Sequence, residues 1–243
     1  MKTPAILGPL PKTTPKRARL RSATAWTELL VNCGIPRVVA ARWGVPFANV
    51  VREDTFSAGD RDLADFLPEI IHESSGLQRM EENLNYSEEA LLATFNSPRR
   101  IRITPEQARA FGRNKAHAAD QQAIANIVYG GAFGRENLGN TQEGDGWKFR
   151  GRGPLQITGS WNYTRMGKLM GQDLTSIPDL LAQPHYALQA CILWWEENVK
   201  DDILGETTSI RKRVNGGNLG LLAVQALTNV VRQALANESA ADL

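Results

Sequence analysis

The feature that most constrains this chain is an apolar repeat with the period of an α-helix, which recurs along the sequence. In each repeat the apolar residues fall on one face of a helix. The clearest groups are Trp26, Leu29, Leu30 and Cys33, then Phe66, Leu67, Ile70 and Ile71, then Leu188, Cys191, Ile192 and Trp195, and finally Val224, Leu227, Val231 and Leu235. The sequence therefore predicts a mainly helical protein in which each of these helices buries one face.

Glycine, proline and capping residues predict where several helices begin and end. Gly34 should stop the first helix, and a short helix over 38–43 should end before Gly44 and Pro46. A further helix is expected over 116–129. Two N-terminal signatures are also present: Ser87 before Glu88 and Glu89, and the capping box Thr104, Pro105 and Gln107.

The segment 68–87 holds two glutamates, Glu73 and Glu82, nine positions apart. In one continuous helix this spacing would point their side chains in opposite directions. The run Ser74, Ser75 and Gly76 favours turns and positive φ, so it predicts that the helix breaks directly after Glu73. The polar residues that follow then form a loop, and Glu82 can face Glu73.

Two carboxylates that face each other can carry out glycoside hydrolysis, in which one donates a proton and the other activates water. Glu73 ends an apolar helix that includes Ile70 and Ile71, and apolar surroundings disfavour the charged form of a carboxyl group. We therefore expect Glu73 to be the acid, and Glu82, on its polar loop, to be the base. The alternative interpretation, which this stretch alone favours, is that both are surface residues, at a helix end and in a charged loop.

Five motifs occur along the chain in a fixed order: His72-Glu73-Ser74, Glu82-Asn83-Leu84-Asn85-Tyr86-Ser87, the glycine-rich run 144–159, Trp161-Asn162-Tyr163, and Asn215-Gly216-Gly217. Together they resemble the glycoside hydrolase family 19 chitinases, and most closely the phage endolysin branch of that family. The resemblance extends from about Thr24 to the end of the chain. It implies a lysozyme-like, two-lobed helical fold with a substrate cleft and only minor β and loop elements.

The resemblance also assigns roles to residues. It implies that Glu73 is the general acid, that Glu82 is the base, and that Thr158 holds the attacking water. Plant members place their base further along a longer loop, so the match at Glu82 is the less direct of the two. Ser75 and Leu77 depart from the family pattern beside the acid. The implied substrate-binding residues are Gln156, Trp161, Asn162, Asn215, Asn85 and Tyr86.

Charge separates the first residues from the rest of the chain. Residues 1–22 contain six basic side chains, four prolines and no acidic residue, and because the whole chain carries +2, the remainder carries −4. Such a segment should not form a helix, and basic runs often associate with anionic polymers or lipid surfaces. We expect a disordered basic tail over 1–22, with or without a role of its own, and a single catalytic domain over 23–243.

Neither a cofactor nor a metal is expected. The three histidines are scattered, and His72-Glu73 lacks the second histidine of a zinc-binding H-E-x-x-H motif. Cys33 and Cys191 occupy apolar helical positions, so both should be buried free thiols. No secretory signal or membrane-spanning run is visible. We therefore expect a monomer made in the host cytoplasm that reaches the periplasmic cell wall by another protein's action, as endolysins do through a holin.

The expected function is inverting hydrolysis of the β-1,4 bonds of bacterial peptidoglycan, leading to host cell lysis. One alternative is a chitinase that acts on N-acetylglucosamine polymers. Another is a non-catalytic protein that binds cell wall or nucleic acid, since the helices around Cys33-Gly34-Ile35-Pro36 follow a basic arm as in a helix-turn-helix. The segment 37–43 has few side chains suited to reading bases, so we expect no specific nucleic-acid partner.

Overall fold

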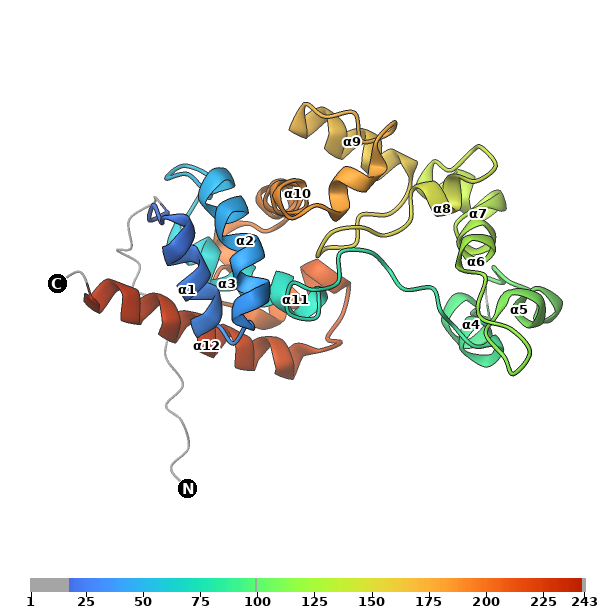
Figure 1. Ribbon diagram of the computed structural model, residues 1–243, viewed down its shortest axis with the longest axis horizontal. Helices are drawn as coiled ribbons and strands as arrows, with labels where there is room; N and C mark the ends of the chain where they lie inside the picture. The colour runs from blue at the N-terminus through green and yellow to red at the C-terminus, as the bar shows by residue number, and fades with distance from the viewer. Residues whose placement is uncertain (1–17, 99, 242–243) are drawn as a thin grey trace, which may run out of the picture. The chain divides into compact units, whose positions relative to one another are not determined.

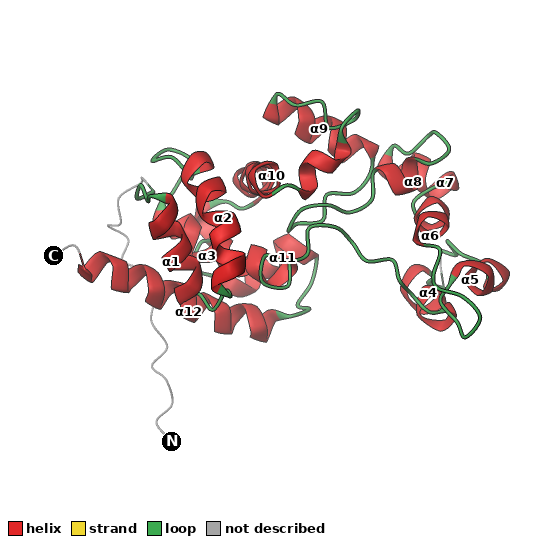
Figure 2. Cartoon of the chain, in the orientation of Figure 1, coloured by secondary structure: helices red, strands yellow, loops and turns green. Residues whose placement is uncertain are grey.

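The computed structural model describes residues 18–98 and 100–241, and most of these residues are helical (Figures 1 and 2). Extended residues among them form only isolated bridges. The helices are α1 (Ala23–Asn32), α2 (Arg37–Val50), α3 (Asp60–Glu73), α4 (Glu88–Phe95), α5 (Pro105–Phe111), α6 (Gln121–Val128), α7 (Gly131–Leu138), α8 (Asp145–Lys148), α9 (Ser160–Met170), α10 (Pro184–Asn198), α11 (Thr207–Asn215) and α12 (Leu221–Ala241), with short 3-10 helices η1 (Pro178–Ala182) and η2 (Asp201–Ile203). The predicted mainly helical class is confirmed.

The described residues form two compact units. The first unit contains residues 18–80, 153–155 and 183–241, and therefore α1 to α3 and α10 to α12. The second unit contains residues 81–98, 100–152 and 156–182, and therefore α4 to α9 with η1. The described part of the segment 23–243, which was predicted as a single catalytic domain, therefore divides into two compact units.

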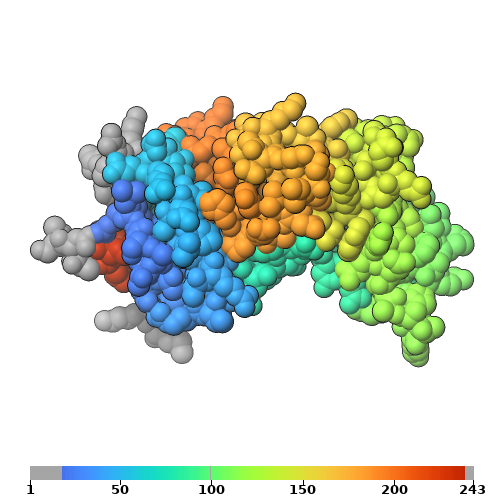
Figure 3. Space-filling model, turned by 45° about the horizontal axis from the view of Figure 1, so that its top comes forward, coloured from blue at the N-terminus to red at the C-terminus, as the bar shows by residue number. Residues whose placement is uncertain are grey.

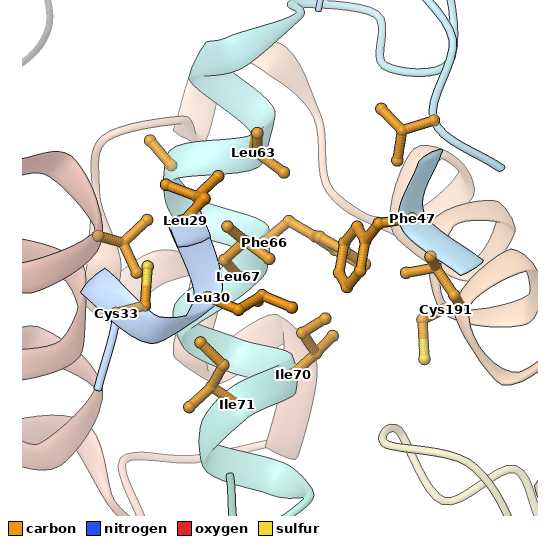
Figure 4. Packing of buried hydrophobic residues seen from close by; sticks show 14 of the residues in the cluster. Leu29, Leu30, Cys33, Phe47, Leu63, Phe66, Leu67, Ile70, Ile71 and Cys191 are labelled. Carbon is orange, nitrogen blue, oxygen red and sulfur yellow. The ribbon is translucent and has the colours of Figure 1, made fainter. Parts of the chain in front are cut away.

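Helix α3 lies at the centre of the apolar core of the first unit (Figure 4). Most of its residues are buried, and α1, α2, α10 and α12 pack around it. Complete burial of a Leu, Ile or Phe side chain contributes about 1.5–3 kcal/mol, so α3 is held firmly along its length. The core side chains labelled in Figure 4 are Leu29, Leu30, Cys33, Phe47, Leu63, Phe66, Leu67, Ile70, Ile71 and Cys191.

The predicted end of the second helix is wrong, because α2 continues through Gly44 and Pro46 to Val50. A Cβ atom at Gly44 would lie 2.3 Å from Thr27 Oγ1, so glycine here permits close packing of α2 against α1. A proline at position 46 removes the N–H that would bond the carbonyl of Arg42. Residue 42 is exposed, so water can bond to that carbonyl instead.

The predicted helix break after Glu73 is confirmed, because α3 ends at that residue. Ser74 Oγ accepts a hydrogen bond from the Leu77 backbone N–H at 2.8 Å, which closes a tight turn. Ser75, Gly76 and Leu77 all have positive φ, of 53°, 76° and 62°. Three successive residues in the left-handed region cannot continue a right-handed helix, so the chain leaves α3 abruptly.

The second unit has a smaller apolar core, formed mainly by α4, α5 and α6. The predicted capping signatures are confirmed: Ser87 Oγ accepts from Ala90 N, and Thr104 and Gln107 form a capping box. The helix predicted over 116–129 begins later, with α6. The reason is Asp120, whose side chain accepts from the Ala123 backbone N–H at 2.9 Å and so caps the helix at that point. The buried residues of this core are Leu84, Leu91, Phe95, Ile103, Ala108, Ile124, Ala125 and Val128.

The basic tail was predicted to extend to residue 22. Residues 1–17 of that segment lie outside the described residues, and residues 18–22 do not belong to a tail. Ala18 is only 2% exposed and belongs to the core of the first unit. Arg21 forms ion pairs with Asp60 at 3.2 Å and with Glu238 of α12 at 2.9 Å. Figure 3 shows the end of α12, in red, beside this blue N-terminal segment. Residues 18–22 therefore pack on the first unit because both an apolar contact and two charge pairs hold them.

The two cysteines are buried and free, as predicted. Burial raises the pKa of both Cys33 and Cys191 to about 12, so both thiols remain protonated at neutral pH. Trp195 of α10 lies in the core, as its place in the apolar repeat predicts: it is 1% exposed, and its Nε1 donates to Asp62 Oδ1 at 2.8 Å. Trp194 is only partly buried.

Candidate active site

Glu73 occupies the last position of α3, with about a quarter of its side chain exposed. Its carboxylate does not lie in the apolar surroundings expected from the sequence. Instead, Glu73 Oε1 lies 2.5 Å from Nη2 of Arg211 on α11. The side chain of Arg79 donates to the backbone carbonyl of Glu73 at 3.1 Å. The helix thus fixes the backbone of Glu73, and an ion pair fixes its carboxylate.

Arg211 contacts a second carboxylate on the same helix, that of Glu69. Arg211 Nη1 donates to Glu69 Oε2 at 2.5 Å, and its Nε donates to the carbonyl of Leu219 at 2.7 Å. Arg211 and Glu69 are each only 1% exposed. Burial raises the pKa of Glu69 to about 7, although Arg211 acts in the opposite direction. Neither Glu69 nor Arg211 was predicted from the sequence, although the spacing of four between Glu69 and Glu73 places those two glutamates on one helix face.

Glu82 lies in the irregular segment that begins the second unit, and both of its carboxylate oxygens accept hydrogen bonds. Oε1 accepts from the backbone N–H of Gly151 at 2.6 Å, and Oε2 accepts from the hydroxyl of Tyr129 at 2.8 Å. The backbone N–H of Glu82 also donates to the Gly151 carbonyl at 2.9 Å. Two hydrogen bonds therefore fix this carboxylate and a third fixes its backbone, although the segment has no regular secondary structure.

Tyr129 is a third residue of the site that the sequence patterns did not predict. It follows α6, and its ring packs edge-on against Phe95 at 6.1 Å between centroids. Burial, and then the charge of Glu82, raise the pKa of its hydroxyl well above the usual value. Tyr129 therefore stays protonated and donates to Glu82 over the whole physiological pH range.

Gln156 and Thr158 lie next to the backbone that holds Glu82. A Cβ atom added to Gly151 would lie 2.8 Å from Gln156 Oε1 and 3.2 Å from Thr158 Oγ1, so glycine allows both side chains to approach. The Thr158 hydroxyl donates to the Gln156 carbonyl at 3.0 Å, in a turn where Gln156 has a φ of 52°. The lone pairs of the Thr158 oxygen therefore remain able to accept a hydrogen bond. The structure thus brings Glu82, Gln156 and Thr158 together around Gly151.

Helix α9 carries two further predicted site residues at its start. Asn162 Nδ2 donates to the carbonyl of Thr158 at 2.7 Å, which ties the helix to the Thr158 turn. Trp161 is 57% exposed, and a Cβ atom at Gly139 would lie 2.3 Å from its Cδ1 atom. The indole therefore packs over a glycine and keeps more than half of its surface open. An exposed aromatic face of this kind suits stacking on a sugar ring.

The remaining predicted residues have more local contacts. Tyr86 packs edge-on against Phe95 at 5.4 Å, whereas Asn85 is exposed. Asn215 ends α11 in the first unit; its side chain accepts from Gly217 N at 3.0 Å and donates to the Leu219 carbonyl at 3.1 Å. The Leu219 carbonyl also accepts from Arg211, so this turn is linked to the Glu73 pair.

The predicted site residues divide between the two units. The first unit holds Glu73 with Arg211 and the Asn215 turn, and the second holds the cluster around Gly151 together with Trp161 and Asn162. In the part of the chain that the structure describes, no group of three or more His, Cys, Asp or Glu side chains is arranged to hold a metal ion. No described helix is both long and apolar enough to cross a membrane.

Comparison with known proteins gives the family. The family model described as chitinase class I matches residues 124–206, which include Tyr129, Thr158 and Trp161. A protein of Haemophilus influenzae, named as a glycosyl hydrolase family 19 domain-containing protein, is 35% identical over 159 residues. That match covers 64% of this chain and 71% of the relative. The chain belongs to glycoside hydrolase family 19. It is accordingly a glycoside hydrolase.

Other members of glycoside hydrolase family 19 match over shorter lengths. An endochitinase of Arabidopsis thaliana is 40% identical over 76 residues, which is 30% of this chain and 26% of that protein. Among solved structures, a class IV chitinase from Zea mays is similar over 89% of this chain and 93% of its own, at 14% identity and a TM-score of 0.47. Chitinase C from Streptomyces griseus is similar over 92% of this chain and 73% of its own, at 15% identity and a TM-score of 0.43. The family assignment therefore rests on the sequence matches.

Proposed function

We propose that this glycoside hydrolase cuts the β-1,4 bonds of bacterial peptidoglycan by an inverting acid/base mechanism, as an endolysin. The observation that carries the proposal is the cluster in the second unit. A carboxylate held by Gly151 and Tyr129 lies in the same cluster as the Thr158 hydroxyl, whose oxygen can accept a hydrogen bond. This combination of groups is suited to holding and deprotonating a water molecule.

In the proposed reaction, water donates one hydrogen bond to Thr158 Oγ1 and the other to the Glu82 carboxylate. Glu82 takes the proton while the water oxygen bonds to the anomeric carbon. Glu73 gives its proton to the leaving glycosidic oxygen as the bond between that oxygen and the anomeric carbon breaks. Water attacks from the face opposite the leaving group, so the product has the inverted anomeric configuration. No covalent glycosyl enzyme forms.

The remaining groups serve orientation and substrate binding. The hydrogen bonds from Tyr129 and Gly151 aim the oxygens of Glu82, and Arg211 aims those of Glu73. Trp161 offers its exposed ring for stacking on a sugar, and the segment that carries Gln156, Asn162 and Thr158 supplies polar groups for the hydroxyl and acetamido groups of the glycan.

Peptidoglycan and chitin share the β-1,4-linked N-acetylglucosamine unit, so the substrate must be tested on both. The endolysin-like motif Glu82-Asn83-Leu84-Asn85-Tyr86-Ser87 and the basic first residues favour peptidoglycan, which is anionic. The relative from Arabidopsis thaliana is named an endochitinase, which supports chitin as the alternative substrate. A cell-wall binding protein without turnover is the non-enzymatic alternative.

The test is the release of reducing ends from purified peptidoglycan and, in parallel, from chitin oligosaccharides. Mass spectrometry of the fragments identifies whether the new reducing end is muramic acid or glucosamine. Glu82→Gln should abolish release, whereas Glu89→Gln is a matched control: it makes the same change in the exposed first turn of α4. Equal turnover in both variants would contradict the role of Glu82 as the base. Release of reducing ends from chitin alone would contradict peptidoglycan as the substrate.

The proposed setting follows from the substrate. We propose that the enzyme works as a monomer on the periplasmic cell wall after a holin-type membrane protein has released it. Expression in a Gram-negative host with and without a holin, followed by the optical density of the culture, tests this. Lysis that needs the holin supports the proposal, and equally rapid lysis without it contradicts it.

A further inference from the structure

One face of α3 carries three buried carboxylates, Asp62, Asp65 and Glu69, and then the partly exposed Glu73. Asp62 accepts from Trp195 Nε1 and Ala58 N, and Asp65 accepts from Gly205 N and from Arg232 of α12. Glu69 differs from both. Its Oε2 binds Arg211, while its buried Oε1 has no hydrogen-bond partner among the described residues. A buried carboxylate with one unsatisfied oxygen is costly to keep ionised, so it needs an explanation beyond packing.

Arg211 connects this carboxylate to the one proposed as the acid. Its two terminal nitrogens lie 2.5 Å from Glu69 Oε2 and 2.5 Å from Glu73 Oε1, and the Leu219 carbonyl fixes its Nε. The planar guanidinium therefore holds the two carboxylates in a fixed relation. One positive charge is shared between two groups that can each carry a negative charge.

We propose that Glu69 is a positioning residue of the hydrolytic reaction, which acts through Arg211 to set how much of Glu73 carries the proton that the reaction needs. The proposal rests on the proposed function of Glu73 as the acid. Glu69 touches neither substrate nor reacting atoms, so its effect is on the protonation and orientation of Glu73 alone.

The electrostatics gives the direction of the effect. The charged groups that act on Glu69 are Arg211 on α11 and Asp65 and Glu73 on α3. Arg232 on α12 binds Asp65. The titratable His72 on α3 lies beside Gly220. When Glu69 is ionised, its charge offsets that of Arg211, and Glu73 retains a proton more readily. When Glu69 is neutral, the whole charge of Arg211 acts on Glu73 and favours its ionised form, which has no proton to give.

This coupling operates near neutral pH. Burial raises the pKa of Glu69 to about 7, so Glu69 is ionised at pH values above 7. At those pH values a general acid loses its proton most readily. Glu69 therefore extends the activity of the enzyme towards higher pH.

The first experiment is the pH profile of kcat and KM on peptidoglycan for the wild type, Glu69→Gln and Glu69→Asp. The isosteric Gln is permanently neutral, so the alkaline limb of the kcat profile should move to lower pH by about one unit. This is the low end of the shift that a charge within about 4–6 Å causes, because Glu73 is partly exposed to water. KM should stay within about twofold of the wild type, because Glu69 does not touch substrate. Glu69→Asp keeps the charge and should leave the limb within a few tenths of a unit of its wild-type position.

The matched control is Asp62→Asn, which neutralises another buried carboxylate of α3 that accepts from Trp195 Nε1 and Ala58 N instead of binding Arg211. Its limb should stay in place. An unmoved limb in folded Glu69→Gln, or equal shifts in Glu69→Gln and Asp62→Asn, would overturn the proposal. A wild type that cuts no glycan would refute the proposed function itself, which is a different result.

The second experiment needs neither a variant nor turnover. The side-chain carboxyl carbons of the wild-type glutamates are followed by carbon-13 NMR as the pH is raised. Coupled carboxylates titrate in shared steps, so the Glu73 signal should show a second inflection at the pH where Glu69 titrates. A single inflection for Glu73, independent of Glu69, would overturn the proposal even if Glu69→Gln failed to fold.

Discussion

Replacing Tyr129 with phenylalanine tests whether the hydrogen bonds on Glu82 matter for the reaction. The change removes the hydroxyl that donates to Glu82 Oε2 at 2.8 Å and leaves the hydrogen bond from Gly151 in place. The ring that packs edge-on against Phe95 is kept, so the core of the second unit should be preserved. The variant therefore isolates the orientation of the carboxylate from the packing around it.

A hydrogen bond to a charged group contributes about 1.5–3 kcal/mol. If that stabilisation holds Glu82 in its productive orientation, its loss should lower kcat by about 10-fold to 100-fold, because each 1.4 kcal/mol corresponds to about a factor of ten. Burial and the charge of Glu82 raise the pKa of Tyr129, so the hydroxyl donates throughout the assay range. The loss in kcat should therefore persist throughout that range.

The assay is the release of reducing ends from peptidoglycan, with thermal unfolding measured on the same samples. Tyr186→Phe is the matched control: it removes a tyrosine hydroxyl from α10, in the other unit, and should leave kcat unchanged. A folded Tyr129→Phe with kcat within twofold of the wild type would refute the role of Tyr129. A loss confined to KM would assign the hydroxyl to substrate binding instead of the reaction.

Four further outcomes are expected. Glu73→Gln should fold and bind glycan but lose about 100-fold to 10,000-fold in turnover, as measured by reducing-end release; near-normal turnover would remove Glu73 from the mechanism. NMR of the nascent product should show the inverted anomer, and retention would make Glu82 a nucleophile. Gly139→Ala should lower the melting temperature, because residue 139 has a φ of 74°, and should raise KM, because the new Cβ would displace the Trp161 indole. An unchanged KM would show that the indole is not in a subsite. Deleting residues 1–17 should leave hydrolysis of soluble oligomers intact and slow the lysis of outer-membrane-stripped cells only at low salt. The reason is that attraction between exposed charges is screened over about 8 Å at physiological ionic strength. Equal lysis rates for the full-length and shortened proteins at every salt concentration would show that the basic side chains of this segment are not used.

The corrections to the sequence predictions share a physical cause. Gly44 and Pro46 predict a helix end, yet α2 continues through both, because packing against α1 outweighs the local preference of either residue. Residues 18–22 belong to a basic run in the sequence, yet Arg21 finds Asp60 and Glu238 in the fold. Local patterns do not record such partners, which lie far away along the chain.

The sequence by itself determined the helical class, the helix break after Glu73, the capping signatures and the buried thiols, because each depends on residues within a few positions of one another. It also singled out Glu82 and Thr158 through the family motifs. Only the tertiary structure showed that Glu69 and Glu73 share Arg211, which comes from a helix some 140 positions away, and that Tyr129 donates to Glu82 from 47 positions away. A charge pair or hydrogen bond between such distant positions leaves no periodicity in the sequence, so its energy and its effect on catalysis are decided only when the chain is folded.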